Sequence, residues 1–141
     1  MRTILYIGIN LVGGAVHDAD EWAARQAADL AWIDSQFEKH RLDIEVMIVL
    51  AHSDPDVSTN DPFFVPFFDR IRNEYNMPTI LIHRNLFSET SGSDANYDGI
   101  TNFAVLVAEG NTWPPMRVEL HTTTGQSWSV LWDQDDWFDS V

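Results

Sequence analysis

Two apolar runs, each ending in a histidine, constrain the fold of this chain more than any other feature. The first occupies residues 46–51 and ends at His52; the second occupies residues 78–82 and ends at His83. Runs of this length that are apolar throughout are typical of strands buried on both faces of a parallel sheet. We therefore expect consecutive strand, helix and strand units whose carboxyl ends lie along one edge of the sheet.

Helical signals flank these runs. Asp18 has the form of a helix cap, with Glu21 three residues later, and predicts a helix from about Asp20 to His40. Pro66 is the expected first residue of a second helix, which must end before Pro78. The first helix carries apolar residues on two faces and is expected to be buried on both. One face holds Ala23, Ala27, Leu30, Ile33 and Phe37, and the other holds Ala24, Ala28 and Trp32.

The remaining segments are interpreted as strands and loops. Residues 3–9 are apolar on both faces, as in a covered strand. Residues 53–62 and 86–99 are rich in turn-forming residues and are predicted loops. Three antiparallel strands are expected near residues 103–108, 116–121 and 127–132, joined around 111–115 and Gly125. The sequence thus predicts a single α/β domain over residues 1–132, followed by an acidic tail over 133–141.

Charge and cysteine content exclude several classes of function. The formal net charge is -14, from 22 acidic and 8 basic residues, and disfavours nucleic acid or an anionic membrane as a partner. Such an acidic, lysine-poor surface is typical of proteins in salty surroundings. The chain has no cysteine, so disulfides and thiolate metal sites are excluded. We expect a soluble chain, without a signal peptide or membrane span.

The strand-end residues are the first candidates for chemistry. His52 and His83 are expected to face a common crevice, although a strand-end histidine also commonly serves a structural hydrogen bond. Arg84 is suited to gripping a phosphate or carboxylate. His17 and Asn10, in the loop after the first strand, are candidate substrate contacts.

Several motifs, taken in order, are shared with a known family. They are Asp20-Glu21-Trp22, Ala51-His52 followed by Pro55, a phenylalanine-rich segment with Pro66, a strand ending in His83, and Thr101-Asn102-Phe103. Over roughly residues 4–121 the chain resembles the C-terminal half of calcineurin-like metallophosphoesterases. The resemblance implies half of a four-layer α/β/β/α sandwich, with a mixed sheet, two main helices and a C-terminal antiparallel β region.

The resemblance also implies metal ligands, of which this chain retains a part. His52 matches a metal-binding histidine of the family, with Ala51 where glycine is usual. Asn85 falls on one ligand position of the next cluster, but the other falls on Phe87, which cannot bind a metal. The Asp-x-His and Gly-Asn-His motifs of the family's N-terminal half do not occur in the chain. The candidate ligands for a single zinc, manganese or iron ion are His52, Asp54, His83 and Asn85.

Three hypotheses follow for function. The first is a reduced metallophosphoesterase-like hydrolase that acts on a phosphoester through His52, Asp54 and His83. The second is a non-catalytic relative that binds an anion or a protein. The third is a metal-independent hydrolase in which a histidine acts as general base. Because half of a sandwich would expose an apolar sheet face, we also expect a homodimer or completion by another chain.

Overall fold

A computed structural model of the chain describes residues 3–84, 92–108, 116–122 and 128–133. The helices within these ranges are α1 (Ala19–His40) and α2 (Asp61–Asn73), with short 3-10 turns η1 (Ser58–Asn60) and η2 (Tyr97–Gly99). The strands are β1 (Ile4–Gly8), β2 (Val46–Ala51), β3 (Thr79–Arg84), β4 (Gly92–Ala95), β5 (Phe103–Ala108), β6 (Arg117–Thr122) and β7 (Trp128–Asp133).

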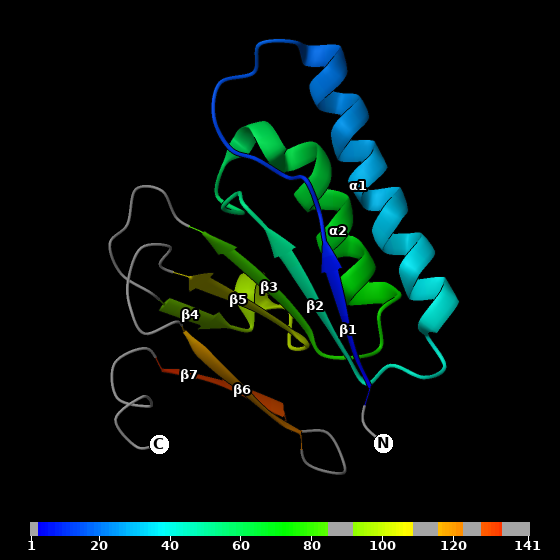
Figure 1. Ribbon diagram of the computed structural model, residues 1–141, viewed down its shortest axis with the longest axis vertical. Helices are drawn as coiled ribbons and strands as arrows, with labels where there is room; N and C mark the ends of the chain where they lie inside the picture. The colour runs from blue at the N-terminus through cyan, green and yellow to red at the C-terminus, as the bar shows by residue number, and fades with distance from the viewer. Residues whose placement is uncertain (1–2, 85–91, 109–115, 123–127, 134–141) are drawn as a thin grey trace.

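The main sheet has the strand order β1, β2, β3, β5, β4 (Figure 1). The first four of these are parallel, and β4 runs antiparallel to β5. Right-handed crossovers between strands that are added in one direction place the connecting helices on one face of the sheet. Accordingly, α1 and α2 both cover the same face (Figure 1). The chain therefore has the mixed α/β fold expected from its sequence.

The hairpin formed by β6 and β7 covers part of the opposite face. This second sheet is antiparallel, as predicted for these two strands. Its apolar side chains pack on the strands in the middle of the main sheet. The buried cluster is Val46, Ile48, Ile80 and Leu106, and the residues packed on it include Ile82, Met116, Val118, Leu120, Trp128 and Val130. None of the described residues in this cluster comes from β1, and Tyr6 of that strand is 63% exposed.

Two predictions for the segment after β3 are wrong. Residues 103–108 form β5, which pairs with β3 in parallel and with β4 in antiparallel orientation, rather than joining β6 and β7 in one antiparallel set. Its apolar residues are buried on both faces because helices and hairpin cover the two sides of the sheet. Residues 92–95, expected in a loop, form β4 on the outer side of β5. Its composition of Gly, Ser, Asp and Ala carries no strand pattern, and its backbone pairs with β5 in antiparallel register.

Helix α1 confirms the predicted cap and bounds but not its predicted burial. The Asp18 carboxylate accepts hydrogen bonds from the backbone N–H groups of Asp20 and Glu21, both at 3.0 Å. Burial is confined to one face, which contains Gln26, Asp29, Leu30, Ile33 and Phe37. Ala23 and Ala27 of the first predicted face are exposed, and so is the second predicted face, with Ala24, Ala28 and Trp32, because α1 packs on the rest of the fold with one side only.

Helix α2 begins five residues before the predicted start at Pro66, which instead lies inside the helix. Pro62 occupies the first turn, where a missing backbone N–H costs nothing. The helix starts early because it buries a cluster of phenylalanines. Phe63, Phe64 and Phe67 are 0 to 1% exposed, and Phe67 packs edge-on against Phe103 of β5.

The predicted acidic tail and the predicted absence of a membrane span remain to be compared with the structure. β7 continues to Asp133, the first residue of the expected acidic tail, and residues 134–141 lie outside the described ranges. Neither described helix combines the length and the apolar composition that a membrane crossing requires.

Candidate functional site at the carboxyl edge of the sheet

The carboxyl ends of β1, β2 and β3 lie along one edge of the sheet, where the segments after β1 and β2 are joined by the hydrogen bond from the His52 N–H to the Leu11 carbonyl. Ligands of open α/β sheets bind outside the carboxyl ends of strands, most often where the strand order reverses. In the described sheet the order β1, β2, β3, β5 runs in one direction, so no such reversal supplies a crevice. A site at this edge must therefore be formed by the strand-end side chains and the loops themselves.

His83 is a buried titratable group at this edge. Its side chain is 2% exposed, and it pairs in register with Ala51 of β2, on the face covered by the helices. Burial lowers the pKa of His83, while the charges of Asp54 and Asp56 and a hydrogen bond with the Arg84 backbone act in the opposite direction. Its Nδ1 atom has no hydrogen-bond partner in the described structure. The imidazole is therefore neutral at pH 7, with one ring nitrogen unused.

His52 does not share the surroundings of His83. The register aligns Ala51, not His52, with His83, and neighbouring residues of a strand point to opposite faces. His52 is exposed just beyond β2, where its backbone N–H donates to the Leu11 carbonyl at 3.1 Å. The expectation that both imidazoles face one crevice is therefore not met. The carboxylates whose charge acts on His83 are those of Asp54 and Asp56.

Asp54 and Asp56 are held by a local turn. The Asp54 carboxylate accepts the backbone N–H of Asp56 at 2.8 Å, and the Asp56 carboxylate accepts the Tyr97 hydroxyl at 2.7 Å. Burial and the Asp56 hydrogen bond raise the pKa of Tyr97, so this hydroxyl remains protonated. Tyr97 lies in η2, and sequence analysis gave no reason to connect it with this loop. Asp54 was named from the sequence, whereas Asp56 and Tyr97 were not.

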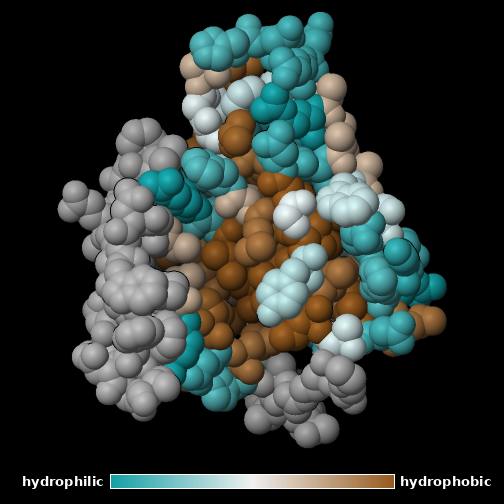
Figure 2. Space-filling model, viewed as in Figure 1, coloured by the Kyte–Doolittle hydropathy of each residue, from teal (hydrophilic) through white to brown (hydrophobic). Residues whose placement is uncertain are grey.

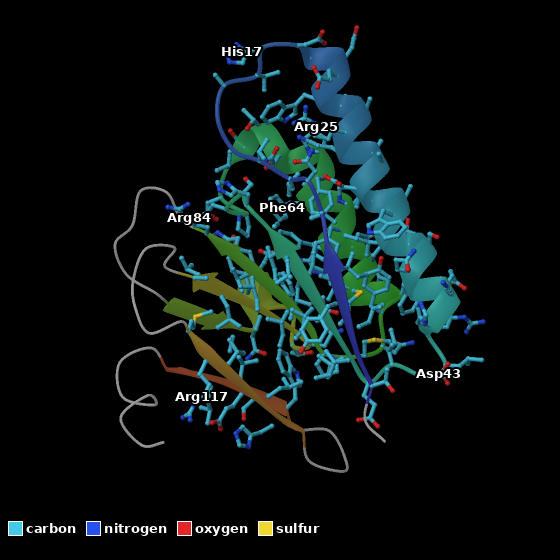
Figure 3. The ribbon with its side chains drawn as sticks, viewed as in Figure 1. His17, Arg25, Asp43, Phe64, Arg84 and Arg117 are labelled. Carbon is cyan, nitrogen blue, oxygen red and sulfur yellow. The ribbon has the colours of Figure 1, made fainter. Side chains whose placement is uncertain are left out.

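Arg84 is the last residue of β3, and its side chain lies on the face of the sheet opposite to the helices. Because it follows His83 in a strand, its side chain starts from the face opposite to the imidazole. Arg84, labelled in Figure 3, is half-buried, and no carboxylate among the described residues pairs with it. In contrast, five other arginines form ion pairs: Arg25, Arg41, Arg70, Arg72 and Arg117.

The remaining predicted site residues lie apart from this group. Asn10 is exposed, and its backbone N–H donates to the Asp29 carboxylate at 3.1 Å, which joins the end of β1 to α1. His17 is exposed in the loop before α1, well away from Arg84 in Figure 3. Asn85, a candidate metal ligand, lies outside the described residues.

A buried amide network at the same edge was not found from the sequence. The Asn60 side chain is 0% exposed. Its oxygen accepts from Trp22 Nε1 and Gln26 Nε2, and its nitrogen donates to the Val12 carbonyl and the Ser53 hydroxyl. These contacts tie α1, η1 and the loops after β1 and β2 together. The network supports the edge and has a structural role.

The described residues do not fit the metal centre that the family resemblance implies. Two-metal phosphoesterase chemistry needs several fixed ligands around ions held about 4 Å apart. Among residues 3–84, 92–108, 116–122 and 128–133, no three His, Asp or Glu side chains lie close enough to hold a metal ion. We therefore derive no catalytic step through a metal.

An open cavity lies at the opposite end of the molecule. It has a volume of about 600 Å³ and is lined by the end of α1, the loop before β2 and the segment after α2. The acidic side chains Glu38, Glu45 and Glu74 contribute to its wall, together with Arg41. Parallel strands begin there rather than end, so this cavity does not coincide with the strand-end group.

Comparisons of the chain with protein-family models, with curated proteins and with solved structures found no match. The likeness to metallophosphoesterases therefore depends on the order and spacing of the sequence motifs alone.

Proposed function

We propose that this chain is a reduced relative of the metallophosphoesterases that binds a small phosphorylated molecule at the carboxyl edge of its sheet. The observation that supports this function is Arg84, a half-buried arginine without a carboxylate partner in the described structure. A guanidinium binds phosphate oxygens through two parallel hydrogen bonds, and partial burial strengthens each of them. Among the described residues, no carboxylate occupies the Arg84 guanidinium, which is therefore proposed to bind such an anion.

The overall charge of the chain makes a specific prediction for this binding. With a formal net charge of -14, the protein repels an anionic ligand over distances that salt can screen. Association of a phosphorylated molecule should therefore become faster as salt increases, until screening also weakens the contact with Arg84. An uncharged ligand should show no such increase.

Calorimetric titration with a phosphomonoester and a phosphodiester tests the proposed function. We expect binding by the native chain and loss of binding in Arg84→Gln. Arg41→Gln is a suitable control because Arg41 is paired with Glu38 on the far end of α1. Binding that survives Arg84→Gln, or that is lost equally in Arg41→Gln, would contradict the proposal.

A second candidate function is metal-independent phosphoester hydrolysis with His83 as general base. The observation that favours it is the Nδ1 atom of His83, which has no hydrogen-bond partner in the described structure. Burial lowers the pKa of this imidazole, and the charge of Asp54 acts in the opposite direction. A neutral imidazole accepts a proton from water, and a nearby carboxylate stabilises the imidazolium that forms. Substrate must reach a side chain that is 2% exposed, so this function requires local opening.

Turnover assays separate the two candidates and the metal-dependent activity implied by the family. Hydrolysis that survives a chelator and is lost in His83→Gln supports His83 as the base. Hydrolysis that is lost with the chelator and in His52→Ala supports a metal-dependent enzyme. Absence of turnover on both phosphomonoesters and phosphodiesters, with binding retained, leaves recognition without catalysis.

A further inference from the structure

β1 is an open edge of the main sheet. In the described structure it pairs with β2 on one side and with no strand on the other (Figure 1). On the β2 side, Ile9 N–H donates to Leu50 and the Thr3 carbonyl accepts from Glu45. Since alternate residues of a strand bond to a given neighbour, the odd residues of β1 serve β2. The backbone groups of Ile4, Tyr6 and Gly8 therefore point to the open side.

The side chains along this edge are apolar and exposed. Ile4 is 38% exposed, Tyr6 63% and Leu50 of the neighbouring strand 43%. They lie on the face opposite the helices, where the hairpin covers β2, β3 and β5 but not β1. Figure 2 shows this apolar surface between the helices and the hairpin. An uncharged, exposed edge strand is a template for pairing with another strand.

Helix α1 adds a second exposed apolar group on the same side. Asp29 of α1 contacts Asn10 beyond β1, whereas Asp34 contacts Arg70 of α2, so these residues mark the two flanks of the helix. Trp32 is three residues after Asp29 and therefore lies on the β1 flank. It is 50% exposed. The open edge is thus bordered by aromatic surface in both layers of the fold.

We propose that β1 pairs with β1 of a second copy of this chain, antiparallel about a twofold axis at Tyr6. In this register Tyr6 lies opposite Tyr6 of the second copy, and Ile4 lies opposite Gly8. The free backbone groups of these residues then bond to one another, as in the hydrogen-bonded pairs of an antiparallel ladder. A Cβ built on Gly8 meets nothing within 4 Å, so space is open for Ile4 of the other copy.

Charge and symmetry favour a second copy over other occupants. β1 contains no charged residue, although the chain as a whole carries a formal charge of -14. A second β1 brings the same uncharged strip, so the paired strands place no like charges opposite each other. A twofold contact also uses the β1 edge of both copies at once, so no β1 edge remains for further addition. The two sheets become one continuous sheet.

Light scattering and sedimentation across a range of concentrations at high salt test this dimer. We expect a dimer of the native chain that dissociates on dilution and becomes weaker at low salt. Tyr6→Lys should abolish it, because two ammonium groups would face each other at the axis. Val65→Lys is the matched control, since Val65 is 64% exposed on α2. A native chain that stays monomeric, a dimeric Tyr6→Lys variant, or a monomeric Val65→Lys variant overturns the proposal.

Thiol cross-linking provides an independent test, because the chain has no cysteine. Side chains directly opposite in an antiparallel pair have Cβ atoms about 5 Å apart. A short bifunctional maleimide should therefore link two copies of the Tyr6→Cys variant efficiently. The control is Leu131→Cys, at a residue that is 56% exposed on β7. Efficient linking of Leu131→Cys with none of Tyr6→Cys places the contact on the hairpin and overturns pairing through β1.

Discussion

Asn60 and His83 are two buried polar residues at the same edge of the sheet, with opposite patterns of hydrogen bonding. Asn60 is 0% exposed and uses both ends of its amide, with partners on α1 and on the loops after β1 and β2. His83 is 2% exposed, yet its Nδ1 atom has no partner within the described structure. Burial alone therefore does not show whether the hydrogen-bonding groups of a side chain are satisfied.

The difference lies in what each group leaves available. A buried amide with all its partners stabilises the fold, and a ligand could bind it only by breaking those bonds. A buried imidazole with a free nitrogen costs stability in the folded state, as does any unpaired polar group. Arg84, beside it in β3, likewise lacks a partner among the described residues. The Asn60 side of the edge is expected to hold the structure, and the His83 side to provide chemistry.

The sharpest test of this comparison is Asn60→Ala. The substitution removes the shared partner of Trp22, Gln26 and Ser53 and leaves buried donors and acceptors unsatisfied. We expect a loss of about 3 kcal/mol in the free energy of unfolding. Urea denaturation measures it. Asn73→Ala is the control, because the Asn73 amide bonds only to exposed Asp69 within its own helix. Equal effects of the two substitutions would contradict a special role for Asn60.

Gln26→Leu should have a smaller effect than Asn60→Ala. It removes two hydrogen bonds, from Gln26 Nε2 to the Thr59 carbonyl and to Asn60. It also removes the Gln26 Oε1 atom, which is buried without a partner in the described structure. Because the second change offsets part of the first, we expect a loss of about 1 kcal/mol in the same denaturation experiment. A loss as large as that of Asn60→Ala would show that Gln26, not Asn60, is the centre of the network.

The contrast between these residues also shows what sequence could predict. Local signals sufficed for α1, where Asp18 provides the cap, and for β2 and β3, which are apolar on both faces. Asn60 carried no such signal. Its amide bonds to the Trp22 indole and to the Val12 backbone carbonyl, which are 38 and 48 residues away in the chain. The start of α2 was missed for a related reason, since burial of the phenylalanines outweighed the preference of Pro66 for a first turn.

The candidate site was predicted in part. Its position at the strand ends follows from the apolar runs, and His83, Asp54 and Arg84 lie there. Which side chains face one another depends on strand register, and the offset of one residue between His52 and His83 separates them. Nothing in a single sequence specifies that offset. Tyr97, which binds Asp56, comes from a segment whose placement depends on β4 and β5.

His83→Leu tests the other half of the comparison. Burial lowers the pKa of His83 from its ordinary value of 6.5, so the unfolded chain binds a proton more readily than the folded one. Protonation of His83 therefore costs no stability well above pH 6.5. As the pH falls below that value, this protonation lowers the free energy of unfolding. His83→Leu should cost less than about 1 kcal/mol at pH 7.5, because an unpaired polar atom disappears with the ring.

Urea denaturation at several pH values between 7.5 and the acid range measures this linkage. As the pH falls below 6.5, the native chain should lose stability relative to His83→Leu, so that the small advantage of the native chain at pH 7.5 shrinks and then reverses. His52→Leu is the control, because His52 is exposed just beyond the neighbouring strand. A native profile that is parallel to that of His83→Leu would mean that His83 gains a proton as easily folded as unfolded.

Arg84→Gln should have the smallest effect on stability. The Arg84 side chain has no ion pair among the described residues, so we expect a change within about 0.5 kcal/mol. Arg70→Gln is the informative contrast, because Arg70 makes two hydrogen bonds to Asp34, at 2.7 and 2.9 Å, and the Asp34 carboxylate also accepts from Tyr75. That substitution should cost more, about 2 kcal/mol. If Arg84→Gln destabilised the chain as much as Arg70→Gln, Arg84 would belong with Asn60 among the structural residues, and its availability for phosphate would lose support.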